Sequence, residues 1–384
     1  MKYPKIYLAI DNCFAFKRWT KPQEWAGVIK EIGVNHIEAS ADTELDPLYM
    51  GSDYLKKWVI ETRAAEKEFG VKVQNLYSGH GTYCTLGLTH TDPEVRRRMV
   101  DYWFKPLIQT ASELEAGLGF FAHAFSESVL EDKSLYSKYM DILYCGLAEL
   151  NTYASLTGCG KIGIEQMYSP HQVPWRISDT IDLLREVKRR SGYDFYFTED
   201  VGHHHTMFLM PKREVIEQAI HNRNVEGLWL GTKKAYEIFN SILNNEAEKQ
   251  ELFDHMENST HMFANENDYD CYSWLRILGC YSPIVHLQQT NGLHSSHQHF
   301  TKNNNNQGII NGKKILEAIM GSYQNPHEGT MPKKCDKIFL TLEAFTGTAS
   351  INKDTINQYK ESVKYWRQYI YQDGLALDML LKNC

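Results

Sequence analysis

The sequence predicts an α/β fold, a closed (β/α)8 TIM barrel with a helical insertion between strands six and seven. Three observations predict it. Short apolar runs of strand length alternate with helical segments almost from end to end, and eight such runs occur. The first run is followed by Asp11-Asn12-Cys13-Phe14, whereas an open dinucleotide-binding sheet usually has a glycine-rich turn there. Parallel strands need crossover connections, and eight strand–helix units close a barrel.

The expected strands are short runs rich in apolar, β-branched and aromatic residues. In chain order they span residues 6–10, 36–39, 71–77, 118–122, 162–165, 195–198, 284–288 and 338–342. Helices are expected between them, the first ending at Gly33 as its C-cap. Asp92-Pro93 opens the third and Ser178 is expected to cap the fifth. These helices cover 21–33, 54–69, 92–114, 135–156 and 178–190, and a C-terminal helix covers 354–381.

One connection is much longer than a single crossover helix needs. The residues between strands six and seven indicate further helices over 213–222, 233–244, 246–255 and 272–278. We therefore expect one barrel domain over residues 1–384, with a helical insertion at about 207–270. The stretch 293–311, which contains four consecutive asparagines, is expected to be a mobile loop.

The composition is that of a globular protein, with 42% hydrophobic residues among 384 and a formal net charge of −7. This acidity argues against nucleic acid as a partner, because such partners need a wide basic surface. No apolar run approaches the length of a membrane span, and the run 6–10 is too short for a signal peptide. The cysteines are scattered without a C-x-x-C pair, which favours reduced thiols in the cytoplasm.

Polar side chains end four consecutive predicted strands. They are Glu165 as the last residue of strand five, Asp200 after strand six, His286 within strand seven and Glu343 after strand eight. In a barrel these ends meet at one mouth, where three carboxylates raise one another's pKa unless a cation is present. One imidazole with three carboxylates suits Mn²⁺, Mg²⁺ or Co²⁺. The alternative for any single acid is a salt-bridged residue at the barrel rim.

These motifs resemble the xylose isomerase-like TIM-barrel superfamily, and within it the ketose 3-epimerases and sugar isomerases. The matching segments are Glu165, Asp200-Val201-Gly202-His203, Val285-His286-Leu287 and Thr341-Leu342-Glu343, of which the Asp-x-x-His pair is the most specific. The resemblance implies one divalent metal ion bound by Glu165, Asp200, His286 and Glu343. It also implies that Glu165 and Glu343 move a proton on opposite faces of the substrate, that His203 contacts a substrate oxygen, and that the protein is a homo-oligomer.

The match has one departure and leaves several candidates open. Where ketohexose epimerases carry an arginine after the strand-seven histidine this chain has Gly292, and the same loop offers His297 as a metal or substrate ligand or as a solvated residue. His80, His123 and Trp175 are further candidate substrate contacts. The alternative for His123 is a histidine inside the barrel that has its own hydrogen-bond partners, and the alternative for Trp175 is a ring packed against its own loop. The loop Thr346-Gly347-Thr348-Ala349-Ser350 allows a phosphate but has no basic residue, which favours an unphosphorylated sugar.

We therefore expect a metal-dependent isomerase or epimerase that interconverts a small sugar or sugar derivative by proton transfer through an enediolate. The alternative is a lyase, a dehydratase or decarboxylase acting on a sugar acid, with Arg176 or Lys17 as the carboxylate partner. A metal-dependent nuclease is disfavoured by the net charge of −7. A protein that only binds sugar is disfavoured because binding alone needs no pair of metal-bound glutamates.

Overall fold

The computed structural model describes residues 3–79, 85–205 and 209–382. Within these residues eight parallel strands form one sheet in the order β2-β3-β4-β5-β6-β7-β8-β1, and β1 pairs with β2 to close it. The predicted (β/α)8 barrel is confirmed. A short ninth strand, β9 (Leu375–Ala376), pairs antiparallel with β1 and was not expected.

The strands begin and end within two residues of the predicted runs. Their bounds are β1 (Lys5–Asp11), β2 (His36–Ser40), β3 (Lys72–Ser78), β4 (Gly117–Phe120), β5 (Ile162–Glu165), β6 (Tyr196–Asp200), β7 (Ile284–Leu287) and β8 (Lys337–Leu342). Strands β4 to β7 are buried along their whole length, because helices cover the outside and side chains fill the inside. This complete burial explains why these strands begin with apolar or small residues, while polar side chains such as Glu165, Asp200 and His286 lie toward their carboxyl ends.

Helices surround the barrel. Their bounds are α1 (Pro22–Ile32), α2 (Ser52–Phe69), α3 (Pro93–Arg98), α4 (Lys105–Glu113), α5 (Glu127–Leu130), α6 (Lys133–Thr157), α7 (Ile177–Ser191), α8 (Arg213–His221), α9 (Lys233–Leu243), α10 (Lys249–Asn258), α11 (Cys271–Leu278), α12 (Lys302–Gln307), α13 (Gly312–Gln324), α14 (Asn352–Trp366) and α15 (Leu377–Leu381). Gly33 ends α1 in the left-handed conformation with φ of 99°, as expected of a glycine C-cap.

Two predicted helices have different ends because distant residues determine them. The expected helix 354–381 ends at Trp366, since Asp373 accepts a hydrogen bond from the Leu8 N–H and turns the chain back to pair with β1. Ser178 does not cap α7, which begins one residue earlier, and the Ile177 N–H is held by Asp268 at 2.8 Å. Both hydrogen bonds, Leu8 to Asp373 and Ile177 to Asp268, join residues that are far apart in the sequence.

Two other segments also differ from the expectation. The helix expected over 92–114 is interrupted by a π-helical segment, Met99–Phe104, between α3 and α4, although Asp92 caps its start as predicted. The expected loop 293–311 contains the short helix α12, which begins where the Thr301 hydroxyl accepts from the Asn304 N–H. A capping side chain thus orders part of the asparagine-rich stretch.

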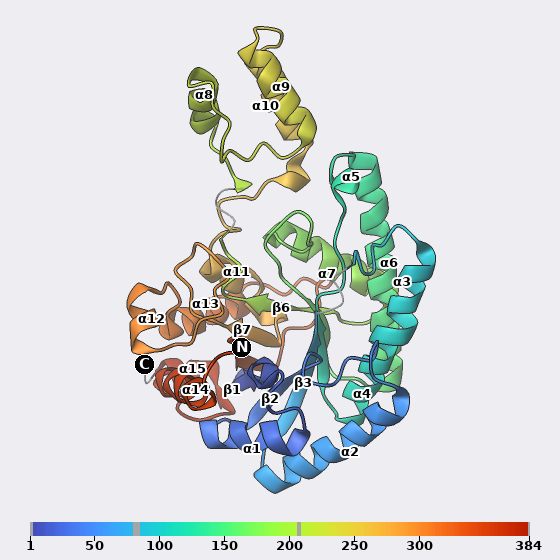
Figure 1. Ribbon diagram of the computed structural model, residues 1–384, viewed down its shortest axis with the longest axis vertical. Helices are drawn as coiled ribbons and strands as arrows, with labels where there is room; N and C mark the ends of the chain where they lie inside the picture. Colours follow the sequence, from blue (N-terminus) through green and yellow to red (C-terminus); the bar gives the residue numbers. More distant parts are fainter. Residues whose placement is uncertain (1–2, 80–84, 206–208, 383–384) are drawn as a thin grey trace.

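Helices α8, α9 and α10 extend away from the barrel (Figure 1). They pack around a small apolar cluster that includes Ile216, Phe239 and Leu252 and is separate from the main core of the barrel. Their position between β6 and β7 matches the expected place of the extra helices. The division of the chain into one domain with an insertion at about 207–270 stays a prediction.

The main core lies between the barrel and its surrounding helices and includes the fully buried Trp25, Trp103 and Trp274. Among the residues with described positions, no helix has both the length and the apolar character needed to cross a lipid bilayer. The described cysteines, Cys13, Cys145, Cys159, Cys271, Cys280 and Cys335, are free thiols.

Candidate active site

A cavity of about 580 Å³ opens where the barrel strands end. Its polar wall comes from the strand ends and the turns after them, and its apolar wall comes from aromatic and methionine side chains in the loops. The lining residues include Asp11, Cys13, Phe16, Ser40, Asp42, Tyr77, Glu165, Met167, Tyr168, His203, Ser295, His297, Glu343, Phe345 and Thr346. The volume is within the ordinary range for a small-molecule site.

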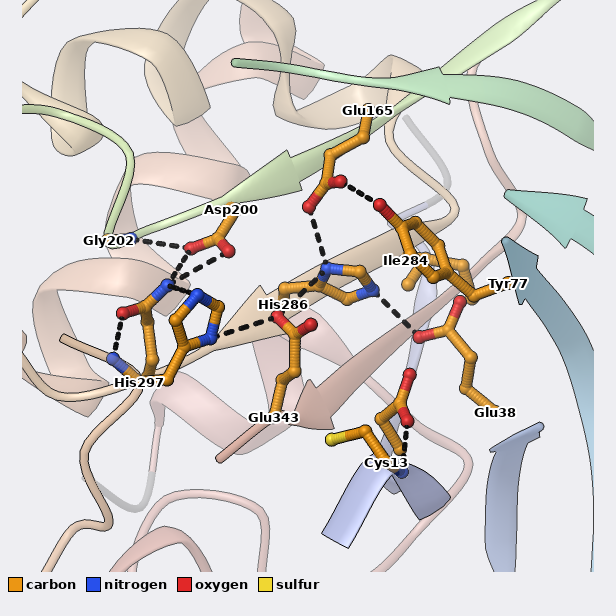
Figure 2. Close-up of polar contacts among 12 residues, drawn as sticks. Cys13, Glu38, Tyr77, Glu165, Asp200, Gly202, Ile284, His286, His297 and Glu343 are labelled. Atoms are coloured by element: carbon orange, nitrogen blue, oxygen red, sulfur yellow. Dashed lines mark hydrogen bonds and ion pairs between the residues drawn. The ribbon is translucent and has the colours of Figure 1, made fainter. Parts of the chain in front are cut away.

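The structure brings together the four side chains expected at the strand ends (Figure 2). Ligand atoms of Glu165, Asp200, His286 and Glu343 all lie within 4.8 Å of one another, and all four residues are buried. The His286 Nδ1 atom is 3.1 Å from Glu165 Oε1 and 3.2 Å from Glu343 Oε2. Three carboxylates and one imidazole therefore share a single small space.

The electrostatics of this cluster are strained without a cation. Burial, and then the charges of Asp200 and Glu165, raise the pKa of Glu343 well above its usual range against the opposing effect of His286. Burial opposes ionisation of His286, yet Glu343 and Glu38 raise its pKa well above the usual value. The pKa of Asp200 is lowered, because His203 and His297 outweigh its burial.

The donor set fits a divalent cation. Glu343 Oε2 is buried and accepts no hydrogen bond among the described residues, although two histidine rings lie 3.2 and 3.6 Å away. A cation within reach of this atom would give it a partner and relieve the repulsion between the carboxylates. Oxygen-rich ligands with one imidazole suit a hard or borderline divalent metal.

A second group of ligand-type atoms adjoins the first. Asp200, His203 and His297 also lie within 4.8 Å of one another, so Asp200 belongs to both groups. His203 Nδ1 donates to the Gln166 carbonyl oxygen at 2.7 Å, which leaves Nε2 facing Asp200 at 3.3 Å. His297 lines the cavity, has its ring stacked on Phe345, and lies 3.6 Å from Glu343.

Sequence reasoning missed three residues that hold this cluster. The Tyr77 hydroxyl donates a hydrogen bond to Glu165 Oε2, and Glu38 contacts His286 Nε2 (Figure 2). The Gln288 amide donates to Asp200. Each lies in or directly after a predicted strand. A polar residue within an otherwise apolar strand was the available signal, the same signal that identified Glu165 and Asp200.

Three other expected substrate contacts have different outcomes. Trp175 is fully buried in the main core and does not line the cavity, so its ring is a packing residue. His123 is also fully buried, with its ring beside Phe121 and Phe125, and burial lowers its pKa to about 3. His123 is not among the described residues that line the cavity, and its expected contact with substrate stays a prediction. His80 lies outside the described residues.

Comparison with protein sequences gives a short match. No protein-family model matches the chain. A stretch of 109 residues is 31% identical to a D-erythrulose 1-phosphate 3-epimerase of Brucella abortus (strain 2308), and it covers 28% of this chain. The match spans 31% of the length of that curated relative.

Comparison with solved structures covers nearly the whole chain. A xylose isomerase candidate from Rhodospirillum rubrum ATCC 11170 has a TM-score of 0.67 at 16% identity, over 94% of this chain and 98% of that one. D-psicose 3-epimerase from Clostridium cellulolyticum H10 has a TM-score of 0.55 at 11% identity, with the same coverage. An L-ribulose 3-epimerase has a TM-score of 0.54 at 12% identity, over 98% of this chain and 96% of that one. The resemblance is thus confirmed in the fold: the chain has the (β/α)8 barrel of xylose isomerase-like proteins and ketose 3-epimerases.

Proposed function

We propose that the protein is a divalent-metal-dependent isomerase or epimerase that moves a proton beside the carbonyl group of a small sugar or sugar derivative. One observation carries the proposal: three buried carboxylates and an imidazole converge at the carboxyl ends of the barrel strands, and two of the carboxylates, Glu165 and Glu343, line the cavity there. Barrel enzymes place their chemistry at this end. The structural likeness to ketose 3-epimerases supports the same reading.

Glu165, Asp200, His286 and Glu343 would hold the ion, which we propose to be Mn²⁺, Mg²⁺ or Co²⁺. When bound, the ion supplies positive charge that stabilises the enediolate formed when the substrate loses its proton. Tyr77 holds Glu165 through one carboxylate oxygen and so fixes the direction of the other. The Glu165 carboxylate is therefore already oriented before substrate binds.

Glu165 and Glu343 are the proposed proton-transfer groups. They come from β5 and from the turn after β8, and both line the cavity. One removes a proton from the carbon next to the carbonyl and the other returns it, a task worth about 10²–10⁴-fold in rate for each positioned group. His203, with Nδ1 fixed by Gln166, presents Nε2 to a substrate oxygen.

The charge of the cavity favours an uncharged substrate. Among the described lining residues there is no lysine or arginine, while several acids are present. Arg176, the expected partner of a sugar acid, instead pairs with Asp179 at 2.6 Å and donates to the Thr260 carbonyl. Lys17, the other expected partner, lies over the Phe16 ring and is not among the described residues that line the cavity. Neither candidate partner for a sugar acid thus reaches the cavity, and we propose an unphosphorylated sugar as the substrate. The Brucella relative is named for a sugar phosphate, so the substrate panel must include sugar phosphates beside the free sugars.

Deuterium exchange tests the proposal directly. The purified protein is incubated in D₂O with Mn²⁺ and a panel of ketoses, aldoses and their phosphates, and deuterium is followed at carbons next to the carbonyl. We expect exchange that EDTA abolishes and that Glu165→Gln and Glu343→Gln each reduce at least about 100-fold. Glu68→Gln, at an exposed position on α2, is the matched control. No exchange with any sugar in the presence of bound metal would refute the proposal.

Three further expectations accompany this function. We propose a homo-oligomer, a cytoplasmic location, and a small-molecule sugar as the partner instead of nucleic acid or a membrane. Light scattering on the eluted protein tests the first expectation, with a mass of a multiple of 44.5 kDa as the predicted result.

A further inference from the structure

The imidazole of His286 separates two groups of buried acids. Its Nδ1 atom faces Glu165 and Glu343 in the cavity, at 3.1 and 3.2 Å. Its Nε2 atom faces away from the cavity and lies 2.8 Å from Glu38 Oε2 (Figure 2). His286 is fully buried and Glu38 is 1% exposed, so water does not compete for this contact.

Strand register determines the position of Glu38. It pairs with Asp11 on β1 and with Asn75 on β3, and the β2–β3 register shifts between Ile37 and Glu38. Such an irregularity re-aims a side chain, and it is common beside active sites. Glu38 Oε1 accepts from Asn75 Nδ2 at 2.6 Å, so both carboxylate oxygens are engaged. Glu38 itself does not line the cavity.

This contact determines which ring nitrogen carries the proton. A neutral imidazole has one donor nitrogen and one acceptor nitrogen, and an ionised carboxylate only accepts. Without a cation, Nδ1 also contacts Glu165 Oε1 at 3.1 Å. When a cation takes the Nδ1 lone pair the ring is neutral, and the hydrogen bond to Glu38 then keeps its proton on Nε2. A carboxylate behind a ligating histidine also makes the imidazole a stronger ligand.

We propose that Glu38 is a positioning residue for the metal centre, acting through His286. The inference rests on the proposed function and extends it, because it assigns a role to an acid that touches neither substrate nor ion. A competing interpretation makes Asp11, Glu38 and His286, whose ligand atoms also lie within 4.8 Å of one another, a second cation site. That site would need the Nε2 lone pair, and Nδ1 would then carry the proton, so the two interpretations exclude each other.

Calorimetric titration of Mn²⁺ into the metal-free protein, without substrate, distinguishes them. We expect Glu38→Leu, which has no acceptor, to raise the dissociation constant about 100-fold, and Glu38→Gln, which keeps one, to raise it about 10-fold. If the leucine variant does not fold, the glutamine variant alone carries the test.

The chain offers a matched control. Glu199 and His204 form another fully buried glutamate–histidine contact at 2.8 Å, and neither residue lines the cavity. Glu199→Gln removes the same kind of ion pair, so we expect it to lower the unfolding midpoint while the Mn²⁺ dissociation constant stays within about twofold. This variant separates loss of stability from loss of ligand positioning.

Each contrary result has a distinct meaning. Wild-type affinity for Mn²⁺ in both Glu38 variants overturns this inference and leaves the proposed function standing. Two bound ions per wild-type chain, with one lost in Glu38→Leu and the other unchanged in affinity, overturn it in favour of the second cation site. A wild-type protein that binds neither Mn²⁺ nor Co²⁺ overturns the proposed function and the inference with it.

Discussion

Gln288 donates from its amide nitrogen to both carboxylate oxygens of Asp200, at 2.9 and 3.0 Å. The amide orientation is fixed, because the Gln288 oxygen accepts from the His297 backbone N–H at 2.6 Å. One buried side chain therefore joins a strand-end carboxylate to the loop that carries His297 over the cavity. Sequence alone gave no indication of this link, since Gln288 follows β7 as one polar residue among several.

Removing this link is expected to weaken the metal centre. In Gln288→Ala, Asp200 loses its amide donor and the loop loses its anchor, so we expect the Mn²⁺ dissociation constant to rise about 10-fold. The unfolding free energy should fall by about 1–3 kcal/mol, because buried polar groups are left unpaired. Calorimetry and urea unfolding measure the two effects. The neighbouring Gln289 donates to Asn305 and Ile310, so Gln289→Ala should lower stability and leave Mn²⁺ affinity unchanged.

Gly202 allows Gln288 its position. A Cβ atom at residue 202 would lie 2.1 Å from Gln288 Cδ, a distance that no relaxed structure permits. Because Asp200 and His297 hold the amide, Gly202→Ala must displace it, and we expect at least a 10-fold loss of Mn²⁺ affinity in calorimetry. Gly51→Ala, where no atom lies within 4 Å of the added Cβ, is the control. Equal Mn²⁺ affinities in the two variants would show that the position of the Gln288 amide does not matter for metal binding.

Tyr77 is expected to affect the rate more than metal affinity. Tyr77→Phe keeps the ring that packs edge-on against His286, with centroids 5.2 Å apart, and removes only the hydroxyl bonded to Glu165. Hydrogen bonds to charged groups contribute about 1.5–3 kcal/mol, which corresponds to about 10–100-fold in rate. We therefore expect kcat to fall by at least about 10-fold in the deuterium-exchange assay, with the Mn²⁺ dissociation constant within about threefold of the wild type. A change confined to metal affinity would show that Tyr77 serves the ion instead.

The strand-end residues were predictable because two general constraints act on them. Parallel strands buried on both faces must be apolar, so polar residues such as Glu165 and Asp200 are conspicuous where those strands end. Glu38 and Gln288 obey the same constraint. Their partners, however, are determined by register across strands far apart in sequence, and no local pattern encodes that register.

Burial and helix ends were less predictable for a related reason. Trp175 and His123 follow strands as substrate contacts do, but whether such a side chain turns toward the cavity or the core depends on packing. The start of α7 depends on Asp268, and the end of the C-terminal helix depends on Asp373. Both are long-range hydrogen bonds, which outweigh the local preferences used to locate a cap.

Acid is expected to destabilise the protein through buried neutral histidines, and His299 provides the test. Burial lowers the pKa of His299 to about 4, whereas an unfolded chain has a histidine pKa of about 6.5. Between these values the unfolded state binds a proton that the folded state does not, so stability is complete above pH 6.5 and is lost as the pH falls toward 4. Each pH unit in this window costs about 1.4 kcal/mol for one histidine.

His299→Phe removes this proton linkage and keeps the edge-on contact with Tyr359, whose ring centroid lies 4.5 Å away. In the wild type the His299 Nδ1 atom is buried without a hydrogen-bond partner among the described residues, so an apolar ring fits the site. Between pH 7.5 and 5.0, urea unfolding should show an acid loss smaller by about 2 kcal/mol in this variant than in the wild type. Replacing the exposed His327 in the same way should leave the full acid loss. An unchanged pH dependence in His299→Phe would mean that His299 takes up its proton equally in both states, in contradiction to its burial.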